Sequence, residues 1–229
     1  IFLLKMSSLS IGIIGYGYIG KAVVNRFLLS SNHNIKILDR NSPSCLDANE
    51  WIQGDFREKS VISKFIKDID ILIHLASSNV PATSSAKSDI KDNVSSMIQI
   101  LDLSKKLNPN IYIIFASSAS IYGNQLQFPI NELCLPLPIS FYGLQKLTIE
   151  HYLRIYNQQC NINYVSCRIS NPYGHGQKKS TIQGIVSIIK YSYQNKSRIS
   201  IYGANECTRD LIHISDLAEA FYKLSLNKP

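Results

Sequence analysis

The stretch IGIIGYGYIGKAVV, residues 11–24, contains a G-x-G-x-x-G pattern between an apolar run and a helical pattern. The three glycines are Gly15, Gly17 and Gly20. The apolar run predicts a buried strand over Ser10–Ile14, and apolar residues at helical spacing predict a helix over Tyr18–Leu29. The N-terminus of such a helix presents free N–H groups and a positive dipole end to a phosphate. The stretch therefore predicts a dinucleotide-binding turn, although the pattern alone is short enough to arise by chance.

Each glycine has its own steric role in such a turn. Gly15 permits the tight turn, Gly17 lets a pyrophosphate approach the backbone, and Gly20 lets the helix pack closely on the sheet. Asp39 follows 19 residues after Gly20 and ends the second predicted strand. Its carboxylate would accept hydrogen bonds from the adenosine ribose and repel a 2′-phosphate, which favours NAD as the cofactor. Arg40 could support that phosphate, so NADP stays open, as does a purely structural glycine turn.

Strand-like and helical patterns alternate along the rest of the chain. Further strands are predicted at Ile35–Leu38, Trp51–Gln53, Ile69–Leu75, Ile111–Phe115, Tyr164–Cys167 and Ile199–Tyr202. Further helices are predicted at Asp89–Leu107, Phe141–Asn157, near Ile182–Tyr193, and after Ser215 as the N-cap. This alternation predicts an α/β fold, a doubly wound parallel sheet with helices on both faces and ligands at the carboxyl ends of the strands.

The composition excludes several classes of protein. The chain has 229 residues, 45% hydrophobic and 17% charged, which is typical of one large globular domain, or of one and a half smaller ones. No apolar run reaches the ~18–20 residues of a membrane span, and IFLLK at residues 1–5 is too short for a signal peptide. We therefore expect a cytoplasmic protein with no membrane partner.

The cysteines and the net charge of +8 indicate neither a metal site nor a nucleic-acid site. The five cysteines are scattered and form no C-x-x-C pair, so we expect free thiols in a reducing compartment and no metal. The lysines are spread along the chain without a dense basic tract or interleaved aromatic residues. Nucleic acid is therefore not an expected partner.

Tyr142 and Lys146 form a Y-x-x-x-K pattern that places both side chains on one face of a helix. A phenol has an ordinary pKa of about 10, but a nearby ammonium and an oxidised nicotinamide both favour the phenolate. The pair can therefore serve as a general acid and base. Ser118, in FASSASIYG directly after a predicted strand, could hydrogen-bond a substrate oxygen. The alternatives are a surface Tyr–Lys pair and a serine-rich turn that caps the strand.

Further motifs occur in a fixed order along nearly the whole chain after Ser10. They are Asp39, GDFRE (54–58), DILIHLASS (70–78), DNV (92–94), SSASIYG (117–123), YGLQK (142–146), RISNPYGHGQ (168–177) and RDLIHISDLAEA (209–220). Together with the glycine turn, this order resembles the extended short-chain dehydrogenase/reductases, within them the NAD-dependent epimerase/dehydratase family and its UDP-glucose 4-epimerase-like members. Each motif is modest, but their common order is specific.

The resemblance implies roles for individual residues. The cofactor would be held by Gly15, Gly17, Tyr18, Ile19, Gly20, Asp39, Arg40, Asp55, Phe56, Leu75, Ala76, Asn93, Tyr142 and Lys146. The catalytic residues would be Ser118, Tyr142 and Lys146. The nucleotide-sugar substrate would be bound by Ser118, Asn171 and Arg209. An arginine also suits the bidentate binding of a phosphate on physical grounds.

The two residues after Ser118 select among the reactions of the family. Dehydratases carry an Asp-Glu pair there, and decarboxylases carry Glu at the second position. Ala119 and Ser120 cannot act as a carboxyl acid or base. We therefore expect an enzyme that epimerises a UDP-hexose at C4 with NAD, through a 4-keto intermediate. A reductase of a 4-keto nucleotide sugar that consumes NAD(P)H, and a non-catalytic dinucleotide-binding protein, remain alternatives.

The chain departs from the family in its glycine turn and in its length. Family members carry T-G-x-x-G-x-x-G, whereas Ile14 stands at the first of those glycines and Gly15 lies one place later. Gln145 stands where a serine is frequent. Family members also continue beyond Pro229 into the sugar-binding lobe, so we interpret the chain as a fragment or a truncated gene product.

The resemblance further implies a division of the chain and a partner. We expect a Rossmann domain with the catalytic residues over 6–170 and the start of a smaller C-terminal substrate lobe over 171–229, interleaved with late Rossmann elements. The helices Asp89–Leu107 and Phe141–Asn157 would pair in a homodimer through a four-helix bundle.

Overall fold

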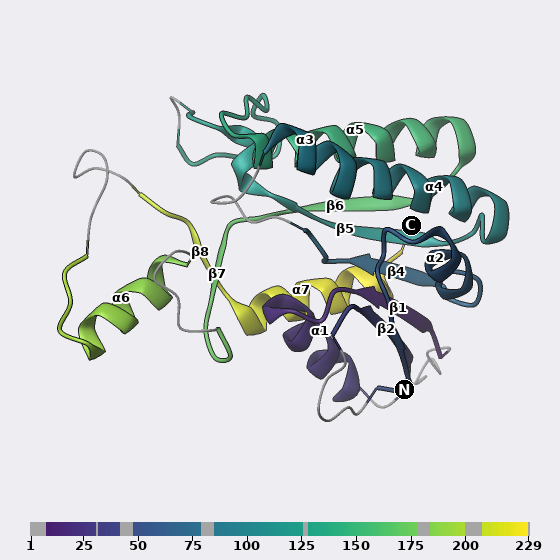
Figure 1. The fold of residues 1–229 in the computed structure, drawn as a ribbon, viewed down its shortest axis with the longest axis horizontal. Helices are drawn as coiled ribbons and strands as arrows, with labels where there is room; N and C mark the ends of the chain where they lie inside the picture. The colour runs from purple at the N-terminus through teal and green to yellow at the C-terminus, as the bar shows by residue number, and fades with distance from the viewer. Residues whose placement is uncertain are drawn as a thin grey trace, which may run out of the picture.

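The computed structural model describes residues 8–30, 32–41, 48–78, 85–125, 128–177, 184–199 and 208–228. A six-stranded sheet, parallel throughout, forms the centre of the molecule in the order β3-β2-β1-β4-β5-β6 (Figure 1). The strands are β1 (Ser10–Ile14), β2 (Asn34–Asp39), β3 (Glu50–Gln53), β4 (Ile71–His74), β5 (Tyr112–Ser118) and β6 (Tyr164–Ile169). The order reverses between β1 and β4, which is the Rossmann arrangement and the place where such sheets bind ligands. The predicted fold class is therefore confirmed.

The central strands do not alternate between polar and apolar residues, because both of their faces are buried. In β1, Ile13 packs into the core on one face of the sheet and Ile14 into the core on the other. In β4, Ile71, Leu72 and Ile73 are all fully buried. Continuous apolar strands of this kind are stable only between two layers of helices.

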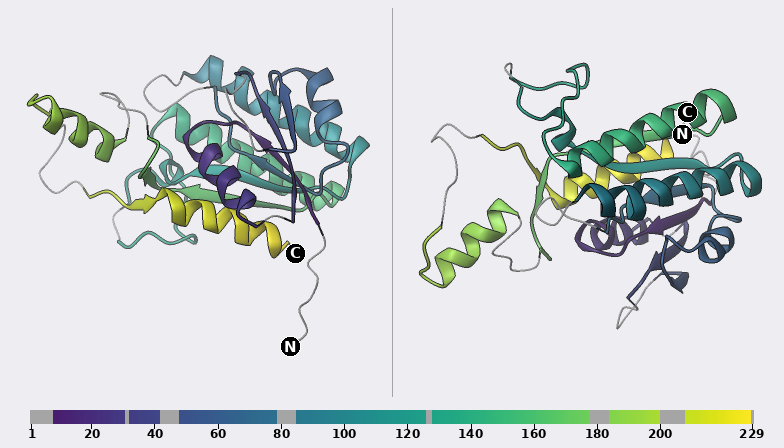
Figure 2. Two further views of the ribbon diagram at one scale, coloured as in Figure 1. Left: turned by 90° about the horizontal axis from the view of Figure 1, so that it is seen from below. Right: turned by 45° about the horizontal axis from the view of Figure 1, so that its top comes forward.

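Helices form a layer on each face of the sheet (Figures 1 and 2). On one face, α1 (Tyr18–Leu28) lies beside α7 (Ile214–Leu226), although the two helices are far apart in the sequence. On the other face, α2 (Lys59–Phe65), α4 (Ser95–Leu107) and α5 (Phe141–Cys160) pack their apolar sides on the sheet. The last helix of the chain thus completes the same core as the first.

The helix predicted over Asp89–Leu107 begins earlier and is irregular. It consists of α3 (Ala86–Asp89), a π-helical turn η2 (Ile90–Val94) and α4. A π turn admits one extra residue into the helix and is frequent near functional sites. Here it carries Asn93, which is buried beneath the segment that follows β4.

A small second sheet leads away from the main sheet toward α6 (Ile185–Gln194), as Figure 1 shows. It pairs β7 (Asn171–Tyr173) with β8 (Leu211–His213) in parallel. Neither strand was predicted, because three residues are too few to show a periodic pattern. The four-residue 3₁₀ turn η3 (Ala119–Tyr122) is also too short for such a pattern, and the seven-residue helix α2 was not predicted either.

Two predictions for the C-terminal part need correction or fall outside the structure. The cap of α7 is His213 and not Ser215, because the helix begins at Ile214 and the imidazole accepts a hydrogen bond from the Ser215 N–H. The predicted strand Ile199–Tyr202 lies outside the described residues except for Ile199, which is in no strand. The helix near Ile182–Tyr193 is confirmed from Ile185 onward.

Within the described ranges, no helix has both the length and the apolar character needed to cross a membrane. The same residues contain no group of three or more His, Cys, Asp and Glu side chains placed to hold a metal ion.

Phe221 tests whether α7 belongs to the core. Its side chain is 1% exposed and belongs to the same buried hydrophobic cluster as Phe27 of α1. We expect Phe221→Ala to lower the free energy of unfolding by about 3–5 kcal/mol in urea titrations, because it removes a fully buried aromatic ring. Leu29→Ala, at a position 83% exposed, is the control and should stay within about 0.5 kcal/mol of the parent. Equal effects would contradict this packing.

Candidate active site

One continuous cavity opens at the carboxyl ends of the strands. Its volume is about 3480 Å³, and its lining includes the glycine turn after β1, the end of β5 and the start of α5. A pocket for a single small molecule usually measures ~300–1,000 Å³. The cavity therefore has room for two extended ligands at once.

Gly15 occupies a conformation that requires glycine. Its φ is +100°, and a Cβ added there would lie 2.8 Å from the backbone nitrogen of Ala76. The turn thus sits directly on the end of β4, where the Ala76 N–H donates to the carbonyl of Ile14 at 2.9 Å. The isoleucine at position 14 is the buried last residue of β1, so the sharp turn is made one place later, by Gly15.

Gly20 and Gly17 differ in what surrounds them. A Cβ on Gly20 would lie 2.0 Å from the carbonyl oxygen of Gly15, so glycine is needed for the close contact between helix and turn. A Cβ on Gly17 would meet no described atom within 4 Å, and Gly17 lines the cavity. Gly17 is also the N-cap of α1 and provides no side-chain hydrogen bond to the helix. The first N–H groups of α1 are thus available to an anion, and the site fits a pyrophosphate.

Asp39 stands at the end of β2 in the wall of the cavity. One carboxylate oxygen accepts a hydrogen bond from the N–H of Tyr16 at 2.7 Å, and the other accepts from the N–H of Asn41 at 2.9 Å. The ring of Tyr16 packs edge to face on Trp51, with 5.5 Å between the ring centroids. Backbone groups therefore fix the carboxylate beside the glycine turn, where a ribose hydroxyl could reach it. Arg40 lines the same cavity.

Two of the expected cofactor residues do not line the cavity. Asp55 forms hydrogen bonds with Arg57 at 2.7–3.0 Å, and these hydrogen bonds hold the Asp55 pKa below its usual range. The Arg57 guanidinium also forms an ion pair with the carboxylate of Asp92, with 3.0 Å between nitrogen and oxygen. The Asn93 amide accepts a hydrogen bond from the Ser78 N–H at 3.0 Å and donates to the Ser78 hydroxyl at 3.0 Å. These residues support the cavity wall from behind, whereas the remaining expected cofactor residues line it directly.

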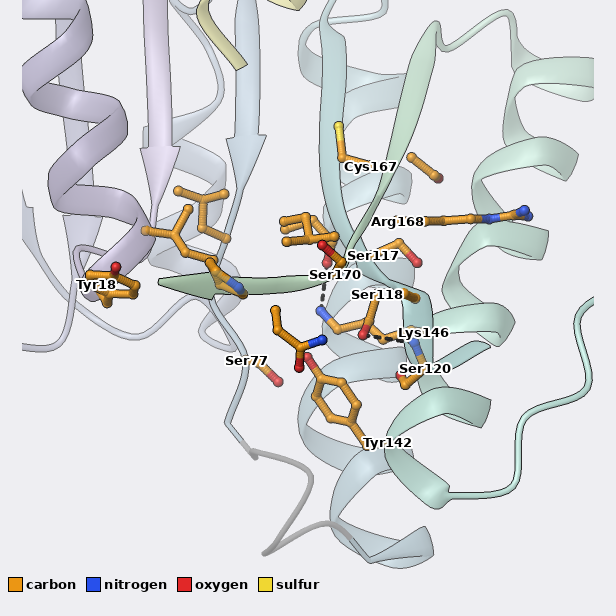
Figure 3. A pocket seen from close by; sticks show the side chains of 18 of the residues that line it. Tyr18, Ser77, Ser117, Ser118, Ser120, Tyr142, Lys146, Cys167, Arg168 and Ser170 are labelled. Atoms are coloured by element: carbon orange, nitrogen blue, oxygen red, sulfur yellow. Dashed lines mark hydrogen bonds between the residues drawn. The ribbon is translucent and has the colours of Figure 1, made fainter. Parts of the chain in front are cut away.

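The three expected catalytic residues lie together on one side of the cavity (Figure 3). Ser118 is the last residue of β5, and its hydroxyl accepts a hydrogen bond from the Ser120 N–H at 3.2 Å. Tyr142 and Lys146 come from the first turns of α5, which Ser140 caps by accepting a hydrogen bond from Gly143. Figure 3 also shows Tyr18, from the glycine turn, across the cavity from this group.

Lys146 is buried, and its ammonium donates a hydrogen bond to the carbonyl oxygen of Ala116 at 2.7 Å. It also lies 4.7 Å from the centre of the Phe115 ring. Burial lowers the pKa of Lys146 to about 8, while the carboxylate of Glu150 opposes that change. The ammonium form therefore predominates near neutral pH, but with a narrow margin.

Tyr142 has a raised pKa, which differs from the expectation that Lys146 would lower it. Burial is the main cause; hydrogen bonding with Ser118 lowers the pKa, and the charge of Asp89 raises it. The Lys146 ammonium lies 5.8 Å from the centre of the tyrosine ring and is bonded to the Ala116 carbonyl. Tyr142 is thus a neutral phenol at neutral pH unless a further positive charge lies next to it.

His74 was not predicted to matter, yet it lies next to this site at the end of β4. Both ring nitrogens are buried and have no hydrogen-bond partner among the described residues. Its ring stacks edge to face on Phe56, with 5.4 Å between centroids, and contacts Phe115. Burial, followed by the charge of Lys146, lowers the His74 pKa to about 3. The imidazole is therefore neutral at physiological pH.

Asn171 and Arg209 come together through the small second sheet. Asn171 pairs with Leu211 in the register of β7 and β8, and its side-chain amide donates to the carbonyl of Asp210 at 2.8 Å. Arg209 is exposed and bonds to the Thr208 carbonyl at 2.8 Å. Both side chains line the large cavity. They add an amide and a guanidinium to the wall of the cavity.

A Rossmann sheet with a glycine turn after β1 and a serine–tyrosine–lysine group at β5 and α5 defines the class of extended short-chain dehydrogenase/reductases. The chain belongs to the NAD dependent epimerase/dehydratase family, whose sequence model matches residues 11–228.

Two curated relatives are similar over most of this chain. A protein of Methanocaldococcus jannaschii with the provisional name UDP-glucose 4-epimerase is 31% identical over 215 residues, covering 90% of this chain and 70% of the relative. The dTDP-4-dehydro-6-deoxyglucose reductase of Escherichia coli is 33% identical over 219 residues, covering 90% of this chain and 69% of the relative.

A solved structure shares the fold. The UDP-glucuronic acid 4-epimerase of Bacillus cereus, in complex with UDP-glucuronic acid and NAD, superposes with a TM-score of 0.83 at 25% identity. The match covers 96% of this chain and 74% of that one.

The two glycines at the start of α1 should respond differently to the same substitution. Gly17→Ala should change the free energy of unfolding by less than about 1 kcal/mol, because the new methyl group meets only open space. It should weaken NADH binding, followed by fluorescence, about tenfold or more, because the methyl group fills the cradle of the pyrophosphate. Gly20→Ala should impair both quantities, with about 1–3 kcal/mol lost from stability. Unchanged NADH binding by both variants would exclude the assigned phosphate site.

His74 predicts a specific loss of stability in acid. Its pKa is about 3 in the folded protein and ~6.5 in the unfolded chain, so only the unfolded chain binds a proton between these values. Stability from this residue is complete above pH ~6.5 and falls as the pH drops, by ~3 kcal/mol between pH 7 and pH 4. In urea titrations at pH 7 and pH 4, His74→Leu should reduce the difference in the free energy of unfolding between the two pH values. The control is His175→Leu at an exposed position, which should leave it unchanged.

Proposed function

We propose that this protein is an NAD-dependent epimerase of a nucleotide sugar, acting on a UDP-hexose at C4. The observation that carries the proposal is the convergence of Ser118, Tyr142 and Lys146 in the same cavity as the glycine turn. The lack of a carboxyl side chain at positions 119 and 120 supports epimerisation over dehydration. The names of two similar proteins point to the same substrate class, as one is a UDP-glucuronic acid 4-epimerase and the other has the provisional name UDP-glucose 4-epimerase.

The described residues fit a bound dinucleotide. The N-terminus of α1 would hold the pyrophosphate, with Gly17 leaving room for it, and Asp39 would accept hydrogen bonds from the adenosine ribose. The carboxylate disfavours a 2′-phosphate, so we propose NAD rather than NADP even though Arg40 lies nearby. When bound, an oxidised nicotinamide supplies a hydride acceptor and a positive charge.

Tyr142 would act as the general base and then as the general acid. In the proposed reaction its phenolate takes the proton of the C4 hydroxyl and later returns it to the 4-keto oxygen. Burial favours the neutral phenol, so a positive charge near the ring makes proton loss easier and couples base strength to occupation of the site. Ser118 would hydrogen-bond the reacting oxygen and keep it in line with the tyrosine.

Lys146 would have a positioning role in the site and would not itself transfer protons. Its ammonium is anchored on Ala116 at 2.7 Å and keeps donor capacity for a ribose hydroxyl. Arg209 and Asn171, which also line the cavity, would bind the diphosphate of the sugar nucleotide, since a guanidinium matches phosphate oxygens bidentately. The hexose would then lie between these residues and Tyr142, free to turn over in a cavity of this size.

We also propose that residues 6–170 form the cofactor domain and that 171–229 contribute to substrate binding. The support is that β7, β8 and α6 extend from the main sheet and that residues of all three line the cavity. A homodimer through α4 and α5 is part of the same proposal, since both helices keep partly exposed apolar residues such as Leu107 and Ile155.

A reductase of a 4-keto nucleotide sugar is the second candidate. It is favoured by the 33% identity to a reductase of a dTDP-4-keto sugar. The same residues would then donate a proton to the keto oxygen, and reduced cofactor would be consumed in each turnover. The two functions differ in whether the cofactor is regenerated.

The test uses purified protein with UDP-galactose and no added cofactor. We expect formation of UDP-glucose, measured by chromatography, with no net change in NADH absorbance. Tyr142→Phe should reduce the rate by about 10²–10⁴-fold, because the general acid–base group is lost. Tyr156→Phe is the control on the same helix; it loses a hydrogen bond to Asp102 outside the cavity and should retain activity.

Three results would overturn parts of this proposal. Net NAD(P)H oxidation with a 4-keto sugar and no isomerised product would favour the reductase. Binding of reduced cofactor without turnover of any nucleotide sugar would favour a non-catalytic protein. A Tyr142→Phe variant with nearly full activity would remove the assigned catalytic role.

A further inference from the structure

Glu150 is a buried carboxylate that the proposed reaction does not use directly. It lies on α5 one turn after Lys146 and is 8% exposed. One of its oxygens accepts a hydrogen bond from the hydroxyl of Ser117 at 2.5 Å. The other accepts from the Arg168 guanidinium at 2.9 Å. The carboxylate therefore has partners on two different strands, as a buried charge requires.

Arg168 extends the connection from β6 to the turn that follows Ser118. Its guanidinium donates to the hydroxyl of Tyr122, the last residue of η3, at 2.8 Å, and to the carbonyl of Glu132 at 3.1 Å. It also lies 5.1 Å from the centre of the Tyr122 ring. The Glu150–Arg168 pair thus links α5, β5, β6 and η3, which are the elements around the reacting side chains.

Two consecutive residues of β5 are bonded to two consecutive turns of α5. The carbonyl of Ala116 accepts from Lys146, and the hydroxyl of Ser117 donates to Glu150. Ser118 follows directly in the chain and carries its side chain into the cavity. A shift of the helix along the strand would therefore have to break both bonds together.

We propose that Glu150, together with Arg168, is a positioning residue that keeps Lys146 in its ammonium form and in register with Ser118. The inference rests on the proposed function, since Lys146 and Ser118 are given their roles there. It is distinct from a simple structural ion pair, because it assigns to the charge of Glu150 an effect on the ionisation of Lys146.

The surroundings of Lys146 show why a carboxylate is needed. The groups that face the lysine are neutral or apolar from the other elements: His74 on β4 and Phe115 on β5. On its own helix, Tyr142 is a neutral phenol at neutral pH. Two more charges lie close by, Arg168 paired with Glu150, and Asp89 of α3 acting on Tyr142.

Burial lowers the Lys146 pKa to about 8 even with Glu150 present. Without the negative charge, the pKa should fall further, into or below the neutral range, by about one pH unit or more. If the positive charge of Arg168 is removed instead, the Glu150 carboxylate loses its partner and should raise the pKa of Lys146. A role limited to packing predicts no such opposite changes.

The test measures the ionisation of Lys146 without relying on turnover. The rate of labelling of Lys146 by acetic anhydride, read by mass spectrometry of its peptide from pH 6 to 10, gives the pKa in the intact protein. We expect the midpoint to move to lower pH in Glu150→Gln and to higher pH in Arg168→Gln. Glu219→Gln removes a similar ion pair with Arg26, between α1 and α7, and should leave the midpoint unchanged.

The pH profile of sugar turnover provides the second measurement. In Glu150→Gln, the alkaline limb of kcat should move to lower pH by the same amount as the labelling midpoint, and Glu150→Asp should restore part of it. If Glu150→Gln does not fold, the upward change in Arg168→Gln decides alone. Equal midpoints in the parent and folded variants, or changes of the same sign, would overturn the inference. Opposite labelling changes in a protein that turns over no sugar would support it and reject the proposed function.

Discussion

The hydrogen bond between the Lys146 ammonium and the Ala116 carbonyl is the interaction on which the candidate site depends. At 2.7 Å in a buried setting, it fixes α5 against the carboxyl end of β5. Tyr142 lies one turn earlier on the same helix, so the contact also sets the place of the phenol relative to Ser118. A slip of the helix by one residue along the strand would move Tyr142 and Lys146 together away from Ser118.

The topology of the sheet explains why groups far apart in the sequence reach one cavity. Parallel strands end at a common edge, and the reversal of strand order between β1 and β4 leaves an opening there. The half before this point contributes backbone N–H groups at the glycine turn, which suit an anion. The half after it contributes the side chains of Ser118, Tyr142 and Lys146. Binding and chemistry would thus rest on different kinds of group, held by one rigid sheet.

Sequence patterns predicted the sheet, and they predicted that Ser118, Tyr142 and Lys146 lie together, because both features depend on local spacing. Apolar runs located five of the six strands, a weaker pattern at Trp51–Gln53 located β3, and Y-x-x-x-K placed Tyr142 and Lys146 on one helix face. The raised Tyr142 pKa, and the lack of hydrogen-bond partners for the His74 nitrogens among the described residues, could not be predicted, because they depend on burial by residues from several elements. Glu150 was a missed signal, because its position four residues after Lys146 places the two side chains on the same face of the helix. The three-residue strands β7 and β8 lie below the length at which a pattern is visible.

The most direct test of the proposed epimerisation follows a label at the reacting carbon. UDP-galactose with deuterium at C4 is incubated with the purified protein, and the recovered UDP-glucose is analysed by mass spectrometry. If hydrogen leaves C4 as hydride and returns within the same closed site, the product keeps the deuterium at C4 and none appears in water. Replacement of the deuterium by solvent hydrogen, or no conversion by cofactor-loaded protein, would contradict this account.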